Sequence, residues 1–196
     1  MFARDFRYYE GSGDFFVRVI SGTARWRKLK EPAGDSIRPT GDMVKESVFN
    51  IIQFDIEGRC VLDLFAGTGQ LGIEALSRGA KSAEFIDLKP DAVKLIRENL
   101  KICGFSELAS VYLRDALRYL ESNEKYDLIF IDPPYDTPLI DKAILKIIEF
   151  DKLNLNGIII CETQANAVMP DEFLSFFSYK EYRYGTVKIV RLSRES

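Results

Sequence analysis

The stretch that most constrains the fold runs from Val61 to Gly72 and has the sequence Val-Leu-Asp-Leu-Phe-Ala-Gly-Thr-Gly-Gln-Leu-Gly. Its apolar start predicts a short buried strand, and the glycines after it predict a tight turn that opens a helix. Gly67, Gly69 and Gly72 have the Gly-x-Gly-x-x-Gly spacing of nucleotide-binding loops, and Asp87 follows where such folds place a ribose-binding acid. The pattern predicts a small-molecule site, although such glycines can also serve only to form a turn.

Asp63 lies inside the predicted strand, in a place where a dinucleotide site does not require an acid. Its carboxylate could hold the glycine loop or accept a hydrogen bond from an ammonium group. An adenosine that carries an amino-acid tail would suit such a site.

Composition limits the remaining possibilities. A chain of 196 residues with 46% hydrophobic side chains is expected to form one domain with a substantial core. The absence of histidine excludes Ser-His-Asp and Cys-His catalysis and histidine metal sites, and we expect no metal. The three scattered cysteines predict reduced thiols, and no segment resembles a membrane span or a signal peptide, so we expect a cytoplasmic protein.

The first residues contain a local basic patch that the net charge of -3 conceals. Residues 17–30 predict two short strands joined by a turn, and residues 18–45 contain seven basic side chains against three acids. Basic side chains around a tryptophan can contact phosphates and stack on a base, although a solvated edge hairpin has the same composition. The predicted RNA-binding residues are Arg18, Arg25, Trp26, Arg27, Lys28 and Arg38.

A helix with an apolar stripe follows this patch, with Thr40 as its expected N-cap. Because this helix directly precedes the glycine-loop strand, Asn50 could border the same pocket. We divide the chain into an arm without an assigned role (1–16), a basic hairpin and helix (17–55) and a catalytic core (56–196).

Strands and helices alternate through the rest of the chain and end in a hairpin near Gly185. This order predicts an α/β fold with a doubly wound, mostly parallel sheet, whose ligand lies at the carboxyl ends of the strands. The predicted strands are 61–64, 82–87, 109–113, 126–131, 157–162 and two within 178–192, and the predicted helices after the glycine loop are 71–78, 90–102, 116–121, 139–150 and 171–176. The glycine loop, Asp87, Asp115 and Asp132 all emerge at that edge.

The central strand 126–131 ends at Asp132-Pro133-Pro134-Tyr135. Two prolines remove two amide donors, so the Asp132 carboxylate and the Pro133 carbonyl can present only acceptors. Two acceptors suit an exocyclic amine of a base, and Tyr135 offers an aromatic face for stacking. The segment could also be an ordinary proline turn.

The chain resembles class I methyltransferases that use S-adenosylmethionine, and more closely the RsmD-type 16S rRNA guanine-N2-methyltransferases. The resemblance spans residues 18 to about 192 and is carried by six motifs. These are Arg18-Val-Ile-Ser-Gly22, Arg38-Pro39-Thr40, Glu46-Ser-Val-Phe-Asn50, Asp63-Leu-Phe-Ala-Gly-Thr-Gly69, Gly72-Ile-Glu-Ala-Leu-Ser-Arg-Gly79 and Asp132-Pro-Pro-Tyr135. The chain departs from the family pattern at Gln70, where a small residue is usual, and in residues 1–16, which precede the family's usual start.

The resemblance implies a seven-stranded Rossmann-like sheet with an antiparallel C-terminal strand and an N-terminal hairpin and helix. It implies that Asp132 to Tyr135 hold a target guanine, with Asp132, Pro133, Pro134 and Tyr135 as the catalytic residues. The cofactor-binding residues that we predict for S-adenosylmethionine are Thr40, Asn50, Asp63, Phe65, Gly67, Thr68, Gly69, Asp87, Leu88, Asp115, Ala116 and Asp132. The expected partner is small-subunit rRNA or the assembling small ribosomal subunit, and the expected state is a monomer.

Four alternatives remain. An adenine-N6 methyltransferase shares the tetrapeptide but usually needs a recognition domain, and protein-glutamine methyltransferases carry asparagine where this chain has Asp132. A nicotinamide-dependent oxidoreductase would leave the tetrapeptide unused. A non-enzymatic RNA-binding module would leave the pocket unused.

Overall fold

The computed structural model describes residues 17–32, 40–135 and 137–195, with Thr40–Asp42 as backbone only. The predicted arm (1–16) and Arg38 lie outside these residues, and so does the Thr40 side chain. The division of the chain at residue 56 stays a prediction.

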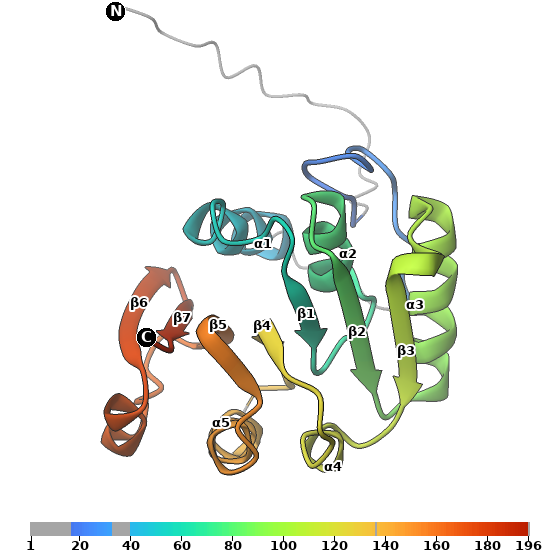
Figure 1. Ribbon diagram of the computed structural model, residues 1–196. Helices are drawn as coiled ribbons and strands as arrows, with labels where there is room; N and C mark the ends of the chain where they lie inside the picture. Colours follow the sequence, from blue (N-terminus) through green and yellow to red (C-terminus); the bar gives the residue numbers. More distant parts are fainter. Residues whose placement is uncertain (1–16, 33–39, 136, 196) are drawn as a thin grey trace, which may run out of the picture.

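A seven-stranded sheet forms the centre of the molecule, in the order β3-β2-β1-β4-β5-β7-β6 (Figure 1). The first five strands are parallel, and β7 pairs antiparallel with both β5 and β6. The strands are β1 (Cys60–Asp63), β2 (Ser82–Asp87), β3 (Ala109–Leu113), β4 (Tyr126–Ile131), β5 (Leu153–Gln164), β6 (Ser178–Tyr184) and β7 (Val187–Ser193). The predicted doubly wound sheet with an antiparallel C-terminal strand is confirmed.

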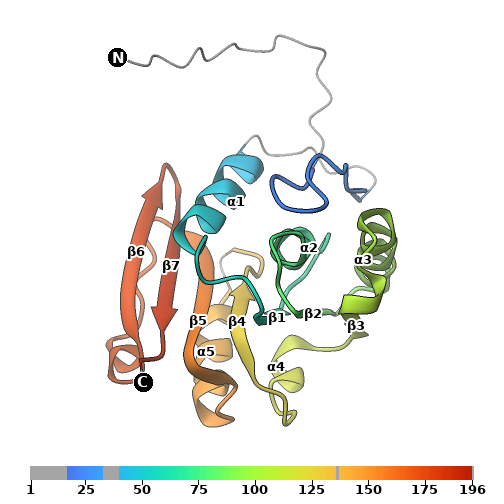
Figure 2. The same ribbon diagram turned by 45° about the horizontal axis from the view of Figure 1, so that its top comes forward.

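Helices cover both faces of the sheet (Figure 2). On one face lie α1 (Thr40–Ile51), α2 (Gln70–Ser77) and α3 (Pro90–Cys103), and on the other lie α4 (Ala116–Tyr119) and α5 (Leu139–Glu149). Short 3₁₀ turns follow at Ser106–Leu108 (η1) and Asp171–Ser175 (η2).

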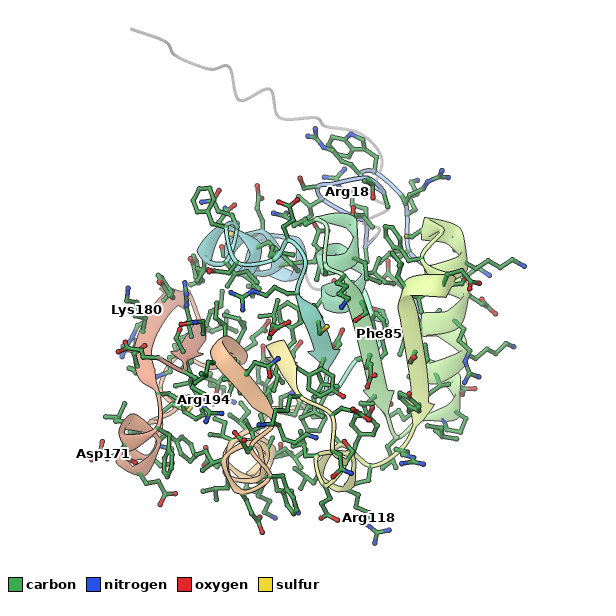
Figure 3. The ribbon with its side chains drawn as sticks, viewed as in Figure 1. Arg18, Phe85, Arg118, Asp171, Lys180 and Arg194 are labelled. Carbon is green, nitrogen blue, oxygen red and sulfur yellow. The ribbon has the colours of Figure 1, made fainter. Side chains whose placement is uncertain are left out.

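The two faces of the sheet bury two separate apolar clusters, because successive side chains of a strand point to opposite sides. Phe130 and Ile160 pack towards α1 and α2, whereas Ile129 and Cys161 pack towards α5. Figure 3 places Phe85 inside the molecule, while the Arg18, Arg118 and Lys180 side chains extend outward. The alternation fixes which face each strand-end residue occupies.

Three predicted elements differ from the structure. Residues 17–30 form a hairpin with a single antiparallel bridge, Arg18 to Lys28, because the segment bonds mainly to α2 instead of extending a sheet. The helix predicted at residues 171–176 is the 3₁₀ turn η2, and β5 begins four residues earlier than the 157 predicted, since Leu153 pairs with Tyr126. Within the described residues, no helix is long and apolar enough to span a membrane.

Candidate active site

The predicted acids gather at one edge of the sheet. Asp63 ends β1 and Asp87 ends β2, while Asp115 and Asp132 follow β3 and β4 closely. Because β1 to β4 are parallel, these carboxylates emerge at the same edge, as the sequence predicted. None of the four forms an ion pair with a residue that the structure describes. This edge therefore favours a ligand that carries positive charge.

Asp63 is almost fully buried, with 2% of its surface exposed. Its Oδ2 accepts a hydrogen bond from the amide of Gly72 at 3.0 Å, so the carboxylate does hold the start of α2. Burial, together with the charge of Asp87, raises the pKa of Asp63 to about 7, although the Gly72 amide opposes that shift. Since the unfolded chain ionises at a lower pH, this group lowers the stability of the fold as pH rises from about 4 to 7.

The glycine loop is fastened to the end of β2 by Asp87. Its Oδ2 accepts from the Gly67 amide at 2.9 Å, and its Oδ1 accepts from the Lys89 amide at 2.8 Å. Each oxygen keeps a second lone pair for a ligand. Gly69 has a left-handed backbone, with φ of 77°, which lets the loop turn into α2.

Gly72 is needed for packing. A Cβ atom at this position would lie 2.3 Å from the ring of Phe85, so only glycine lets α2 lie this close to β2. The Gly-x-Gly-x-x-Gly spacing is thus explained by a turn and a close approach.

For the other predicted cofactor-binding residues that the structure describes, it shows no hydrogen bond to the glycine loop. Asp115 caps α4 by accepting from the Arg118 amide at 2.9 Å, and Ala116 behind it is buried. Leu88 is 67% exposed, Phe65 packs partly into the core on the α5 side, and Asn50 is exposed on α1. Their roles in binding the cofactor stay predictions.

Asn99 on α3 is fully buried and joins two segments that the sequence treats separately. Its Nδ2 donates to the Thr68 carbonyl in the glycine loop at 3.0 Å and to the Lys30 carbonyl at 3.1 Å. Its Oδ1 accepts from the Lys30 amide at 2.7 Å. One side-chain amide thus connects the glycine loop to the basic segment, by which we mean residues 17–32.

The Asp-Pro-Pro-Tyr tetrapeptide follows β4 at the centre of the sheet. The Asp132 residue is half-buried, and no described residue donates a hydrogen bond to its side chain. Burial, followed by the charges of Glu162 and Asp63, raises its pKa well above the usual range. Its acceptors are thus available to a ligand with N–H groups.

Tyr135 has a partner that the sequence did not predict. Its hydroxyl donates to Oε1 of Glu162 on β5 at 2.5 Å, and its ring packs against the core on the α1 side. A cavity borders the tetrapeptide between the start of α5 and the end of β5, with Pro134, Ile140 and Thr163 in its wall. The sequence signal for Glu162 was its place at the end of a predicted parallel strand.

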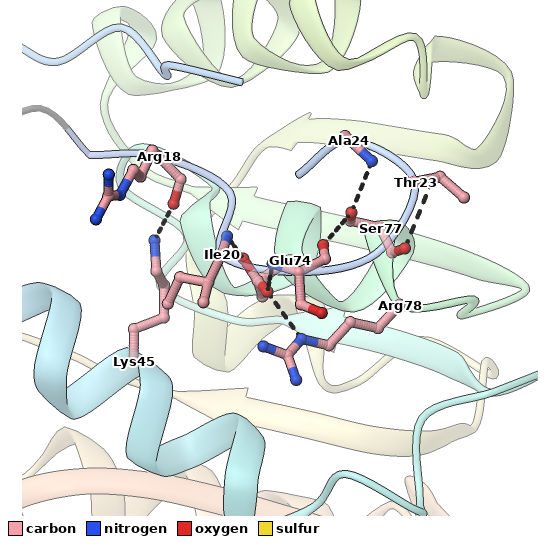
Figure 4. Close-up of polar contacts among 9 residues, drawn as sticks. Arg18, Ile20, Thr23, Ala24, Lys45, Glu74, Ser77 and Arg78 are labelled. Carbon is pink, nitrogen blue, oxygen red and sulfur yellow. Dashed lines mark hydrogen bonds and ion pairs between the residues drawn. The ribbon is translucent and has the colours of Figure 1, made fainter. Parts of the chain in front are cut away.

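The basic segment docks on α2 through buried polar groups (Figure 4). Glu74, which is fully buried, accepts from the amides of Ile20 and Ser21 at 2.7 and 3.0 Å and from Nε of Arg78 at 2.8 Å. The buried Lys45 of α1 donates to the Arg18 carbonyl at 2.6 Å. The segment is therefore a fixed part of the body.

Five of the six predicted RNA-binding residues lie in this segment, and all five are exposed: Arg18, Arg25, Trp26, Arg27 and Lys28. The guanidinium carbons of Arg18 and Arg25 lie 5.0 and 4.5 Å from the Trp26 ring centroid. The Trp26 ring therefore makes cation–π contacts with two arginines, and a base that stacked on the ring would compete with these arginines for its faces. The sequence did not indicate this competition.

A family model described as "Conserved hypothetical protein 95" matches residues 17–193. "Ribosomal RNA small subunit methyltransferase D" of Haemophilus influenzae is 39% identical over 153 residues, or 76% of this chain and 79% of that protein. The protein of the same name from Escherichia coli K12 is 30% identical over 190 residues, or 96% and 94%. A solved structure of the Escherichia coli protein yhhF, 30% identical, matches with a TM-score of 0.81 over 93% of this chain and 99% of that one.

The sheet order, the glycine loop and the tetrapeptide at one edge define a class I, S-adenosylmethionine-dependent methyltransferase. The family model matches nearly the whole described chain, and two relatives are at least 30% identical over most of it, so the kind of methyltransferase can be stated more closely. The chain belongs to the family of RsmD-type methyltransferases.

Proposed function

We propose that this protein methylates the exocyclic N2 amine of a guanine in small-subunit rRNA, with S-adenosylmethionine as the methyl donor. One observation supports the proposal most: the half-buried Asp132 carboxylate, at the end of the central strand β4, accepts no hydrogen bond from a described residue. Acceptors of this kind call for an amine. The names of the Haemophilus influenzae and Escherichia coli relatives support small-subunit rRNA as the substrate.

The residues at the sheet edge suit the cofactor. Four carboxylates without a described cationic partner favour a molecule with a sulfonium and an ammonium group, and Asp63 lies beside the glycine loop. When bound, the cofactor supplies an electrophilic methyl group. In the proposed site, Asp63 and the loop residues Gly67, Thr68 and Gly69 hold the amino-acid end, and Asp87 and Asp115 hold the adenosine.

The tetrapeptide orients the target. Asp132 and the Pro133 carbonyl accept the two N–H groups of the amine and aim its nitrogen at the methyl group, and Tyr135 contacts the base. The bound cofactor would supply this methyl group to the amine nitrogen, and Asp132 would accept the proton that the amine loses as it is methylated. Positioning and the stabilisation of developing charge supply most of the acceleration. No step in this scheme needs a metal or a covalent enzyme intermediate.

The direct test is methyl transfer to small ribosomal subunits from cells that lack the modification. The particles are incubated with the protein and tritiated S-adenosylmethionine, and the RNA is digested to nucleosides. We expect label in N2-methylguanosine. Label in N6-methyladenosine, or a thermal shift with NAD in place of S-adenosylmethionine, would contradict the proposal. We propose that the protein acts as a monomer and that it acts in the cytoplasm, where its three free cysteines would stay reduced.

The raised pKa of Asp63 predicts a pH-dependent affinity. The cationic cofactor should bind the ionised carboxylate, so below pH 7 binding must first remove a proton. We expect the cofactor affinity of the wild-type protein to rise roughly fivefold or more between pH 6.0 and 7.5, relative to Asp63→Asn, as the fraction of ionised Asp63 increases. Titration calorimetry at both pH values measures the cofactor affinity of each protein and gives the ratio of wild-type to Asp63→Asn affinity at each pH.

The comparison with Asp63→Asn isolates Asp63, because the cofactor's own ammonium and Asp132 titrate in both proteins. Asparagine can still accept from the Gly72 amide, so the loop should keep its shape. Asp171→Asn on η2 is the matched control and should follow the wild-type profile. Parallel profiles for wild type and Asp63→Asn would remove Asp63 from the cofactor site.

The basic segment predicts salt-dependent RNA binding. Replacing Arg25, Arg27 and Lys28 together with glutamine should flatten the slope of log affinity against log salt concentration by about two, at about 0.7 per phosphate contact. Filter binding at four salt concentrations measures the slope, and cofactor affinity should stay unchanged. The same triple change at Lys125, Lys146 and Lys180, which lie outside the basic segment, is the control. Equal slopes for the two triple variants would mean that RNA binds elsewhere.

A further inference from the structure

Glu162 and Asp132 lie side by side at the carboxyl ends of two parallel strands. Ile131 of β4 pairs with Cys161 of β5, so the next residues along the two strands are neighbours. Phe130 and Ile160, two residues earlier on each strand, both pack into the core on the α1 side. Because side chains alternate, Asp132 and Glu162 point to that same side.

The two carboxylates are close and have no described cationic partner. The charge of Glu162 is one of the causes of the raised pKa of Asp132, and neither residue forms an ion pair with a described residue. Oε1 of Glu162 accepts from the Tyr135 hydroxyl, while Oε2 accepts no hydrogen bond from a described residue. Like charges at short range are unfavourable unless N–H donors meet them. The pair therefore suits a ligand edge with several adjacent donors.

Guanine has such an edge. Its N2 amine offers two N–H groups, and the neighbouring ring atom N1 offers a third. In adenine and cytosine, the ring nitrogen beside the exocyclic amine is an acceptor, which a carboxylate would repel. A buried site built to bond a donor discriminates strongly against an analogue without that donor.

We propose that Glu162 accepts the N1–H of the target guanine while Asp132 and the Pro133 carbonyl hold the N2 amine. Glu162 is then the residue that selects guanine among bases with an exocyclic amine. This inference rests on the proposed function and adds to it the source of base specificity.

Tyr135 has a second role in this arrangement. Its hydroxyl fixes Oε1 of Glu162, so the carboxylate keeps one orientation, with Oε2 left for the base. The ring and the hydroxyl thus serve different purposes, since the ring contacts the base and the hydroxyl positions Glu162.

The test uses a base analogue that keeps the exocyclic amine but replaces the N1–H donor with an acceptor. The nucleotide that the wild-type protein methylates is first mapped by mass spectrometry. Small subunits are then reconstituted with either guanine or 2-aminopurine at that position. 2-Aminopurine keeps the amine at C2, but its N1 is an acceptor, and it lacks O6. Single-turnover methyl transfer is measured on both substrates.

We expect the wild-type protein to methylate guanine at least tenfold faster than 2-aminopurine. Glu162→Gln can still accept from the Tyr135 hydroxyl and can turn its amide N–H groups towards N1. It should therefore methylate guanine at least tenfold more slowly, and the ratio of the guanine rate to the 2-aminopurine rate should fall at least tenfold. The missing O6 affects both proteins alike, so the change in this ratio reports on N1 alone.

Glu149→Gln, at the exposed end of α5, is the matched control and should keep the wild-type ratio. Calorimetry of cofactor binding checks the fold of Glu162→Gln: a folded variant should bind the cofactor with wild-type affinity, and a misfolded one should not. An unchanged ratio in folded Glu162→Gln would overturn the role of Glu162 while the proposed function stands. If the wild-type protein methylates no guanine, the proposed function itself fails, and this inference fails with it.

Discussion

Asp132→Asn is expected to slow single-turnover methyl transfer about a hundredfold or more, the scale of losing one preorganised electrostatic group. Asparagine keeps one acceptor but loses the charge that stabilises the developing positive charge on the amine. The asparagine amide can also turn an N–H donor towards the amine, and this would disturb the alignment of the amine nitrogen with the methyl group. The measurement is rapid-quench methyl transfer with saturating cofactor and RNA.

The folded state should tolerate this change well. Because burial and two neighbouring carboxylates raise the pKa of Asp132, its charge is unfavourable in the free protein, and an uncharged isostere removes that cost. Thermal unfolding of Asp132→Asn at pH 8 should therefore match or exceed that of the wild type, with Asp171→Asn as the surface control. Methyl transfer at the wild-type rate would show that the carboxylate does not act on the amine.

Gly22→Ala is expected to release the basic segment from the body. Gly22 has a φ of +82°, and a Cβ atom there would lie 1.7 Å from the Ser77 carbonyl oxygen, a backbone atom of α2. That same oxygen accepts from the Thr23 amide at 2.8 Å, so the segment cannot move away without losing bonds. Left-handed strain and overpacking together should cost about 2–5 kcal/mol of docking free energy.

Hydrogen exchange of the amides of residues 19–29 measures this loss, and RNA affinity should fall with it while cofactor affinity falls less. Gly58→Ala is the matched control, because Gly58 has a similar φ of +73° and no atom within 4 Å of its added Cβ. It should cost about 1 kcal/mol and leave the segment docked. If both variants protect these amides equally, the contact with Ser77 does not fix the segment.

Much of the fold was predictable because its determinants are local. β3 and β4 were predicted at their observed bounds, since each is an apolar run that ends in turn residues. The helix predicted at residues 90–102 is α3, which ends at Cys103 because Gly104 takes a left-handed conformation. The acids at the sheet edge followed from the topology, because parallel strands bring their carboxyl ends together.

The contacts that complete the site are long-range, and this is why the sequence did not predict them. Glu74 bonds to residues more than 50 positions away, and Asn99 bonds to Lys30 across 69 positions. In the sequence, Glu74 looks like an ordinary polar residue on a short helix, and Glu162 like the end of a strand. Their roles depend on which strands are neighbours, and local patterns do not carry that information.

The Asn99 side chain couples the position of the basic segment to that of the glycine loop. Three bonds converge on one rigid planar amide, so a displacement of Lys30 must either carry Thr68 with it or break a bond in the buried interior. A ligand that displaces the basic segment should therefore also displace the glycine loop, and the reverse should hold. By thermodynamic reciprocity, any strengthening of cofactor binding by RNA must be matched by an equal strengthening of RNA binding by the cofactor.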